Sequence, residues 1–258
     1  MNKTEAWRLG PLARRAWPLL LLGTIGVLSL LLQPVPAGPL ARAPELANMP
    51  PLVLKAVLLV NPQILVVAAA LLGAALAHRV GLASMLAGTA SSAGWRVTLS
   101  RAAGLGFALG LGLAAADAAV APLLGTAWQA LLAAAPRGVA PTLMGLLYGG
   151  LAEEVMLRWG AMSLFAWLLH SLLRTQGVTP SVVVAIALAA LLFAVAHVPA
   201  LAAQVDLTPA IVARTVALNS VAGLLYGWCF WRHHLEAAMA AHASTHLALA
   251  AWHAAQAL

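Results

Sequence analysis

The sequence predicts an all-α protein, a polytopic transmembrane helix bundle of about seven spans. Hydrophobic residues make up 63% of the 258 residues and charged residues only 8%, whereas soluble domains are nearer half apolar and a quarter charged. The apolar residues gather in long runs, each near or above the ~20 residues that a helix needs to cross a bilayer. The few basic residues lie mainly between these runs, as membrane topology signals do. We therefore expect the lipid bilayer to be the solvent of this chain.

Seven apolar segments are expected to span the membrane, with short loops between most of them. They cover residues 17–37, 52–78, 102–124, 140–172, 180–204, 209–231 and 235–256. The Pro-rich stretch 34–51 is expected to be an extended loop. Residues 126–135 are expected to form a short interfacial helix, with Trp128 as its aromatic anchor.

Two GxxxG steps indicate where helices pack closely. Gly106 and Gly110 form one step, and Gly145 and Gly149 form another just before an acidic pair. Such steps let helix backbones approach each other in the membrane. Chance steps are common in a chain rich in Gly and Ala, so the pattern is a weak indication.

Basic residues in the expected loops indicate the orientation. One side collects nine of them and the other only two, namely Lys3, Arg8, Arg14, Arg15, Arg79, Arg96, Arg101, Arg174 and Arg232 against Arg42 and Arg137. This asymmetry predicts a cytoplasmic N-terminus and an external C-terminus. The formal net charge of +7 comes from dispersed residues, so we expect no nucleic-acid partner.

Most charged residues of the spans lie near segment ends. Lys55 and Arg214 stand within a turn or two of a segment start and are expected to extend to the interface. Asp117 lies deeper, without an evident sequence neighbour, and is interpreted as a polar contact inside the bundle.

The segment 140–172 differs because it carries Glu153, Glu154 and Arg158 near its middle. A charge in the hydrocarbon costs at least ~2.5–3.5 kcal/mol on insertion scales, so such residues indicate function. Glu154 and Arg158 are four residues apart and are expected to form an ion pair. Glu153 points about 100° away on a helix and lacks that partner, which suits proton transfer. The alternative is a structural ion pair with a spare glutamate.

Two further segments carry histidines at similar depth. Phe193 and His197 share one helical face, and His242 and His246 share another, so the two histidines of the last segment could converge on one point. With these segment ends, His197 and His242 would differ by roughly 10 Å in depth at ~1.5 Å per residue. Tilt or a break at Pro199 could close that difference.

These three ordered patterns resemble the motifs of the CPBP family, the CAAX-protease and bacteriocin-processing membrane proteins that include the type II CAAX prenyl protease. The patterns are Glu153-Glu154-x-x-x-Arg158, Phe193-x-x-x-His197 and His242-x-x-x-His246. The resemblance covers roughly residues 140–255. The third family motif usually ends in Asn, where this chain has His246. A histidine can donate a hydrogen bond as an asparagine does, but it can also bind metal.

The resemblance implies a membrane-embedded peptidase of the glutamic type, and we expect no metal or other cofactor. Glu153 would be the general base on water, and His197 would help to hold that water. His242 and His246 would stabilise the oxyanion. The residues expected to fix the catalytic helix are Glu154, Arg158 and Phe193. The chain then divides into N-terminal transmembrane helices of unassigned role, 1–135, and a CPBP-like catalytic bundle, 136–258.

Other functions stay open at this stage. Glu153, His197, His242 and His246 could supply the ligands of a zinc-dependent membrane peptidase. Buried Glu and His residues also mark ion pathways of transporters, and a non-catalytic membrane protein is a further alternative. The expected partners are the lipid bilayer and a membrane-associated protein or peptide substrate. The Ala-, Leu- and Arg-rich composition favours a multi-pass protein of a prokaryotic inner membrane.

Overall fold

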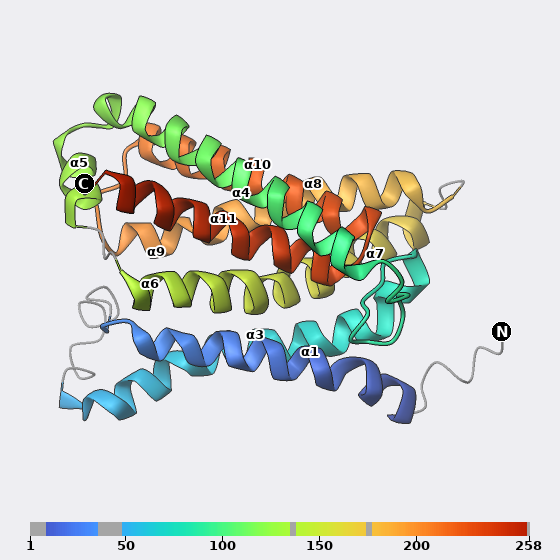
Figure 1. Ribbon diagram of the computed structural model, residues 1–258. Helices are drawn as coiled ribbons and strands as arrows, with labels where there is room; N and C mark the ends of the chain where they lie inside the picture. The colour runs from blue at the N-terminus through green and yellow to red at the C-terminus, as the bar shows by residue number, and fades with distance from the viewer. Residues whose placement is uncertain (1–8, 36–47, 135–137, 174–176, 257–258) are drawn as a thin grey trace.

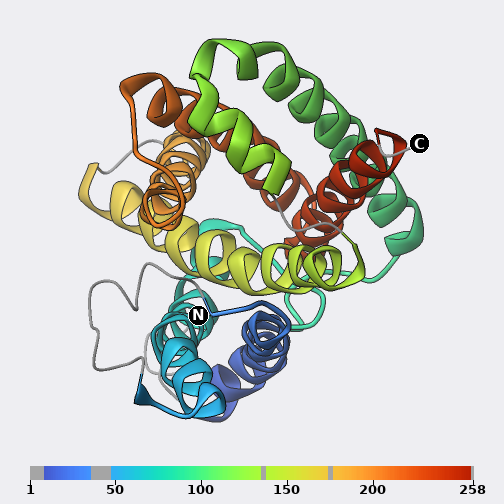
Figure 2. The same ribbon diagram turned by 90° about the vertical axis from the view of Figure 1, so that its left-hand side faces the viewer.

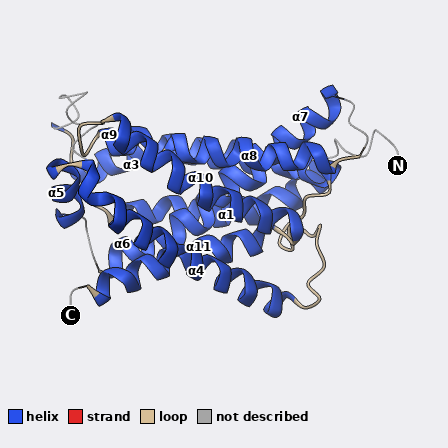
Figure 3. Cartoon of the chain, turned by 90° about the horizontal axis from the view of Figure 1, so that it is seen from above, coloured by secondary structure: helices blue, strands red, loops and turns tan. Residues whose placement is uncertain are grey.

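The computed structural model describes residues 9–35, 48–134, 138–173 and 177–256, and within these ranges all regular structure is helical (Figure 3). The long helices are α1 (Leu9–Ser29), α3 (Pro51–Leu76), α4 (Trp95–Val120), α8 (Thr179–Ala196), α10 (Pro209–Arg232) and α11 (Leu235–Ala255). One further long helix is built of α6 (Val139–Met144), η6 (Gly145–Glu153), η7 (Val155–Met162) and α7 (Ser163–Leu173). The short elements are η2 (Leu30–Leu32), η4 (Ala77–Val80), η5 (Ala121–Leu124), α5 (Thr126–Ala134) and α9 (Val198–Ala202). The all-α class is confirmed.

Six helical segments of the described chain are long and apolar enough to cross a membrane, namely Gly10–Leu32, Pro51–Val80, Trp95–Leu124, Val139–Leu173, Thr179–Ala202 and Pro209–Arg232. Large apolar side chains face outward from these helices. Leu52 is 73% exposed, Ile64 60% and Val183 49%. Such exposure would be costly in water and is the normal state of a lipid-facing helix. The chain is a multi-pass membrane protein.

The seventh expected segment, 235–256, is also a helix, α11, but it is more polar than those six. Its buried polar side chains are Glu236, His242, Ser244 and Thr245. α11 packs along α4, where Gly106 and Gly110 face the backbone of Ala241 and Thr245. The first GxxxG step therefore marks a close helix contact, and α11 lies inside the bundle.

The long helix from α6 to α7 lies at the centre of the bundle. Figure 2 shows α1 and α3 as a pair on one side of it, with α4, α10 and α11 on the other. Small residues allow this packing, because Gly26 of α1 lies against Ala152 and Gly73 of α3 against Trp159. The first two helices thus support the helix that carries the acidic pair. One buried core runs through the bundle from Leu19 to residues of α11, and the division at 135 and 136 stays a prediction.

Successive long helices run in alternating directions, so α1 begins and α11 ends at opposite ends of the bundle (Figure 1).

Several helix ends differ from the expected segments. α1 begins at Leu9, eight residues before the expected start, and α4 begins at Trp95 rather than 102. The early turns of both helices carry arginines, which hydropathy leaves out of a span although the helix continues through the interface. The Pro-rich stretch lies largely outside the described residues.

Candidate active site

Glu154 and Arg158 form a buried ion pair on the central helix, as the sequence predicts. Arg158 Nη1 lies 3.2 Å from Glu154 Oε1, and neither side chain is exposed. Arg158 Nη2 donates to the carbonyl oxygen of Gly223 on α10 at 3.3 Å. The guanidinium also lies over the rings of Phe193 and Tyr226, 4.8 and 5.2 Å from their centroids, which is a cation–π arrangement. Three helices therefore hold this cation in place.

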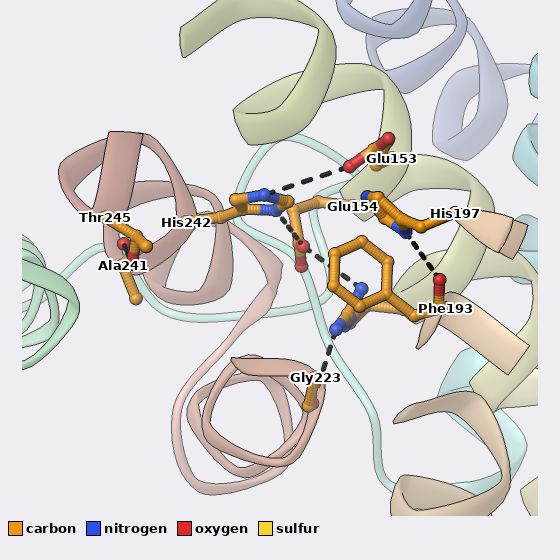
Figure 4. A network of polar contacts seen from close by, with 9 residues as sticks. Glu153, Glu154, Phe193, His197, Gly223, Ala241, His242 and Thr245 are labelled. Atoms are coloured by element: carbon orange, nitrogen blue, oxygen red, sulfur yellow. Dashed lines mark hydrogen bonds and ion pairs between the residues drawn. The ribbon is translucent and has the colours of Figure 1, made fainter. Parts of the chain in front are cut away.

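His242 lies between the two adjacent glutamates (Figure 4). Its Nδ1 is 2.8 Å from Glu154 Oε1, and its Nε2 is 3.8 Å from Glu153 Oε2. Since an ionised carboxylate only accepts hydrogen bonds, Nδ1 is the donor to Glu154. His242 is 3% exposed, whereas the side chain of Glu153 is 16% exposed. Glu154 is thus committed to Arg158 and His242, and Glu153 is the more accessible carboxylate.

His197 reaches the same site from the end of α8. Its Nδ1 donates to the carbonyl oxygen of Phe193 at 2.7 Å, so a neutral His197 carries a lone pair on Nε2. The ring of Phe193 contacts both histidines, with centroid distances of 4.6 Å to His197 and 5.6 Å to His242. The expected difference in depth does not keep His197 from the site; α8 ends at Ala196, and His197 stands at a break before α9. Pro199, in the first turn of α9, favours that break.

His246 lies beside His242 on α11, with the two rings stacked at a centroid distance of 5.1 Å. Gly145 and Gly149 make room for it. A Cβ atom at Gly149 would stand 2.6 Å from His246 Nε2 and 3.1 Å from His242 Nε2, and one at Gly145 would stand 2.7 Å from His246 Nδ1. The second GxxxG step therefore does more than bring two backbones together. It leaves the space that both imidazoles occupy.

The central helix is π-helical through the site. Gly145–Glu153 and Val155–Met162 are both π-helical, with Glu154 between them. π-Helical turns are rare and occur frequently at functional sites. This geometry could not be predicted from the sequence, because nothing in the residue pattern distinguishes i→i+5 from i→i+4 hydrogen bonding. Glu154 and Arg158 nevertheless keep their contact.

Sequence reasoning missed Tyr226. Its ring stacks on His242 with a centroid distance of 4.3 Å and an interplanar angle of 16°, and it is 1% exposed. One signal could have found it: the chain has only two tyrosines, and both stand inside apolar spans. The other, Tyr148, lies five residues before Glu153 in the π-helical segment, which is one π-turn.

A second polar pair, which is partly buried, lies away from this site. Arg214 Nε and Nη2 are each 2.7 Å from a carboxylate oxygen of Asp117, and the guanidinium lies 4.8 Å from the ring centroid of Trp128. The interpretation of Asp117 as a contact within the bundle is confirmed. The expected extension of Arg214 to the interface stays a prediction; the structure adds that its guanidinium pairs with Asp117 of α4. Trp128 belongs to the expected short helix, but it is buried at 3% exposure.

The residues considered as alternative zinc ligands are not placed as a metal centre. Across the described residues, no group of three or more His, Cys, Asp or Glu side chains has the geometry to hold a metal ion. His242 Nδ1 is already bonded to Glu154, and only its Nε2 faces Glu153. We derive no chemical step through a metal from this arrangement.

The fold and the site define a polytopic membrane protein with glutamate and histidine side chains gathered inside its helix bundle. Residues 134–248 match the family model described as Type II CAAX prenyl endopeptidase Rce1-like. This segment of the chain is therefore an Rce1-like domain, and the resemblance inferred from the three motifs is confirmed. Every expected site residue falls within the match. No curated protein and no solved structure matches the chain.

Proposed function

We propose that this protein is an intramembrane endopeptidase that hydrolyses a peptide bond of a membrane-associated protein or peptide. The observation that carries the proposal is the unequal environment of the two glutamates. Glu154 is fixed by Arg158 and His242, whereas Glu153 is partly accessible and lies 3.8 Å from the free nitrogen of His242. A carboxylate with no ion-pair partner on its own helix, next to an imidazole, is suited to accept a proton from water.

In the proposed reaction, Glu153 takes a proton from a water molecule while the water oxygen bonds to the scissile carbonyl carbon. His197 holds that water through the lone pair on Nε2, because its Nδ1 proton is engaged by Phe193. The C–N bond then breaks, and the proton held by Glu153 passes to the leaving amine. Proton transfer by a positioned group of this kind contributes about 10²–10⁴-fold to the rate.

His246 and His242 are proposed to stabilise the oxyanion in different ways. His246 can present an N–H in its neutral form, and preorganised donors of this kind are a large part of catalysis of acyl transfer. His242 donates from Nε2 only as an imidazolium, since its other nitrogen donates to Glu154. Glu154 is proposed to hold the His242 ring so that Nε2 faces Glu153, as the aspartate orients the histidine in a Ser-His-Asp triad.

The proposed mechanism uses no metal. We also propose that the protein lies in the inner membrane of a prokaryotic cell, because the Ala-, Leu- and Arg-rich composition favours that location. The family name refers to prenylated substrates. For this chain we propose the broader class of membrane-associated polypeptides.

The experiment is cleavage by purified protein in lipid vesicles of a pooled set of membrane-anchored peptides, with products identified by mass spectrometry. We expect defined cleavage sites with wild type and none with Glu153→Gln. The absence of any product with wild type across a broad pool, or equal products with both proteins, would contradict the proposal.

A further inference from the structure

A groove runs between α6 and α11 and ends at the candidate active site. Its volume is about 520 Å³, within the range of ligand-binding clefts. One wall is formed by Gly138, Val139, Pro141, Thr142 and Leu143, and the other by His246, Leu249, Ala250, His253 and Ala254 of α11. At its inner end, His246 belongs to both the groove and the site. An occupant of this groove would therefore contact His246, whose ring stacks on that of His242 at a centroid distance of 5.1 Å.

The walls of the groove are almost entirely apolar. Val139, Pro141 and Leu143 line the α6 side. On the α11 side, the small side chains of Ala250 and Ala254 occupy little of the groove. Thr142 also lines the groove, but its hydroxyl already donates to the carbonyl oxygen of Gly138 at 2.8 Å. Small apolar side chains on an occupant could therefore be accommodated, and the two histidines of α11 are the remaining polar groups of these walls.

The two histidines distinguish between possible occupants. His246 and His253 lie seven residues apart on one face of α11, about 10 Å along the helix. Nδ1 of His253 is buried and makes no hydrogen bond to any described residue. A polypeptide in apolar surroundings needs partners for its amide groups, whereas a lipid chain needs none. Polar groups at both ends of an apolar groove thus fit an extended peptide better than an acyl chain.

We propose that this groove binds an extended apolar segment of the polypeptide substrate, on one side of the scissile bond, and that His253 is a specificity-determining residue at its outer end. The proposal rests on the proposed endopeptidase function. The groove would select substrates with small apolar residues next to the cleaved bond. It also gives α6 a role that the family motifs do not cover, since the first motif begins at Glu153.

The test is photo-crosslinking to full-length protein carrying Glu153→Gln, in lipid nanodiscs, so that binding is measured without turnover. The probe is a synthetic Ala- and Leu-rich peptide with one photoactivatable leucine, compared with photoactivatable palmitate. We expect the peptide to label residues 139–143 and 249–254. Ala250→Trp, which fills the groove, should lower this labelling about tenfold, a loss of ~1.4 kcal/mol of binding.

Leu247→Trp is the matched control, because Leu247 lies on the same helix but is 44% exposed and does not line the groove. Its labelling should equal that of the parent. If Ala250→Trp does not fold, Ala254→Trp at the exposed outer end carries the test, with thermal unfolding as the check. His253→Ala should weaken peptide labelling and leave palmitate labelling unchanged.

Three results would overturn the proposal: peptide labels elsewhere on the protein, peptide labelling that Ala250→Trp and Ala254→Trp leave intact, or palmitate labelling the groove in place of the peptide. The proposed function fails separately. If wild type cleaves membrane-anchored peptides while the groove stays unlabelled, only the groove assignment is wrong. If the groove is labelled and wild type cleaves nothing, peptide binding stands and the peptidase proposal falls.

Discussion

Glu154 and His242 are joined by a 2.8 Å contact between Oε1 and Nδ1, so two adjacent glutamates of one helix face opposite nitrogens of a single imidazole. This relationship separates their roles. Glu154 orients the ring and is itself held by Arg158. Glu153 faces the other nitrogen and stays accessible. The different consequences of changing each residue follow from this division.

Glu154→Gln and Arg158→Ala should both lower stability, because each leaves a buried charge without its partner. Removing one member of a buried ion pair costs about 3–5 kcal/mol. Thermal unfolding of purified protein in detergent, together with expression yield, measures this loss. Asp117→Asn is a useful comparison, since its pair with Arg214 is about one-fifth exposed and should contribute less. Wild-type stability of Glu154→Gln would contradict the stabilising role assigned to the Glu154–Arg158 ion pair.

Gly149→Ala should lower activity by displacing both histidines of α11. The added Cβ would stand 2.6 Å from His246 Nε2 and 3.1 Å from His242 Nε2, so the rings must shift. Misplacement by about 1 Å can cost 10²-fold in rate. Gly112→Ala is the matched control, because nothing lies within 4 Å of a Cβ there. Turnover of the two variants, measured on the same peptide, should differ strongly; equal turnover would show that the space beside His246 is not needed.

Metal dependence separates the two peptidase mechanisms. If Glu153 and His197 activate water directly, activity should survive strong chelators, and purified protein should hold no stoichiometric zinc by elemental analysis. His246→Asn should then keep most activity, because the amide still donates a hydrogen bond. If zinc is the catalyst, the amide is a poor ligand, and activity and metal content should fall together. Loss on chelation that added zinc restores would overturn the metal-free account.

The orientation in the membrane is a separate prediction. A reporter fused after Arg174 or Arg232 should read as cytoplasmic, and one after Ala135 or at the C-terminus as external. Several of the residues behind this prediction, including Arg42, Arg137 and Arg174, lie outside the described residues. The alternating helices are compatible with either orientation, so only the charge asymmetry decides it. A cytoplasmic reading at the C-terminus would contradict the expected topology.

Much of the fold could be predicted because membrane spans are long and locally encoded. The apolar runs located the helices, and the helical period correctly paired Glu154 with Arg158. Contacts across helices could not be read in the same way. Tyr226 stacks on His242 from another helix. Arg214 donates to Asp117, which lies 97 residues earlier in the sequence. Such contacts depend on how whole helices pack.

The π-helical geometry and the end of α8 were missed for local reasons. Hydropathy continues past His197, so the segment was extended to residue 204, although the helix breaks at His197. With that break, His197 contacts the same Phe193 ring that His242 contacts. The residues named by the three motifs lie together in the structure, while their catalytic roles stay predictions. The contacts that join them across helices could only be obtained from the structure.

The catalytic assignment of Glu153 is tested most directly by Glu153→Gln, with turnover and thermal unfolding measured on the same preparation. Glu153 has no ion-pair partner on its own helix, so its loss should leave the unfolding temperature close to that of wild type. Turnover of a cleavable membrane-anchored peptide should fall by at least about 10²-fold, since general-base catalysis contributes 10²–10⁴-fold. Wild-type turnover by Glu153→Gln would contradict the account.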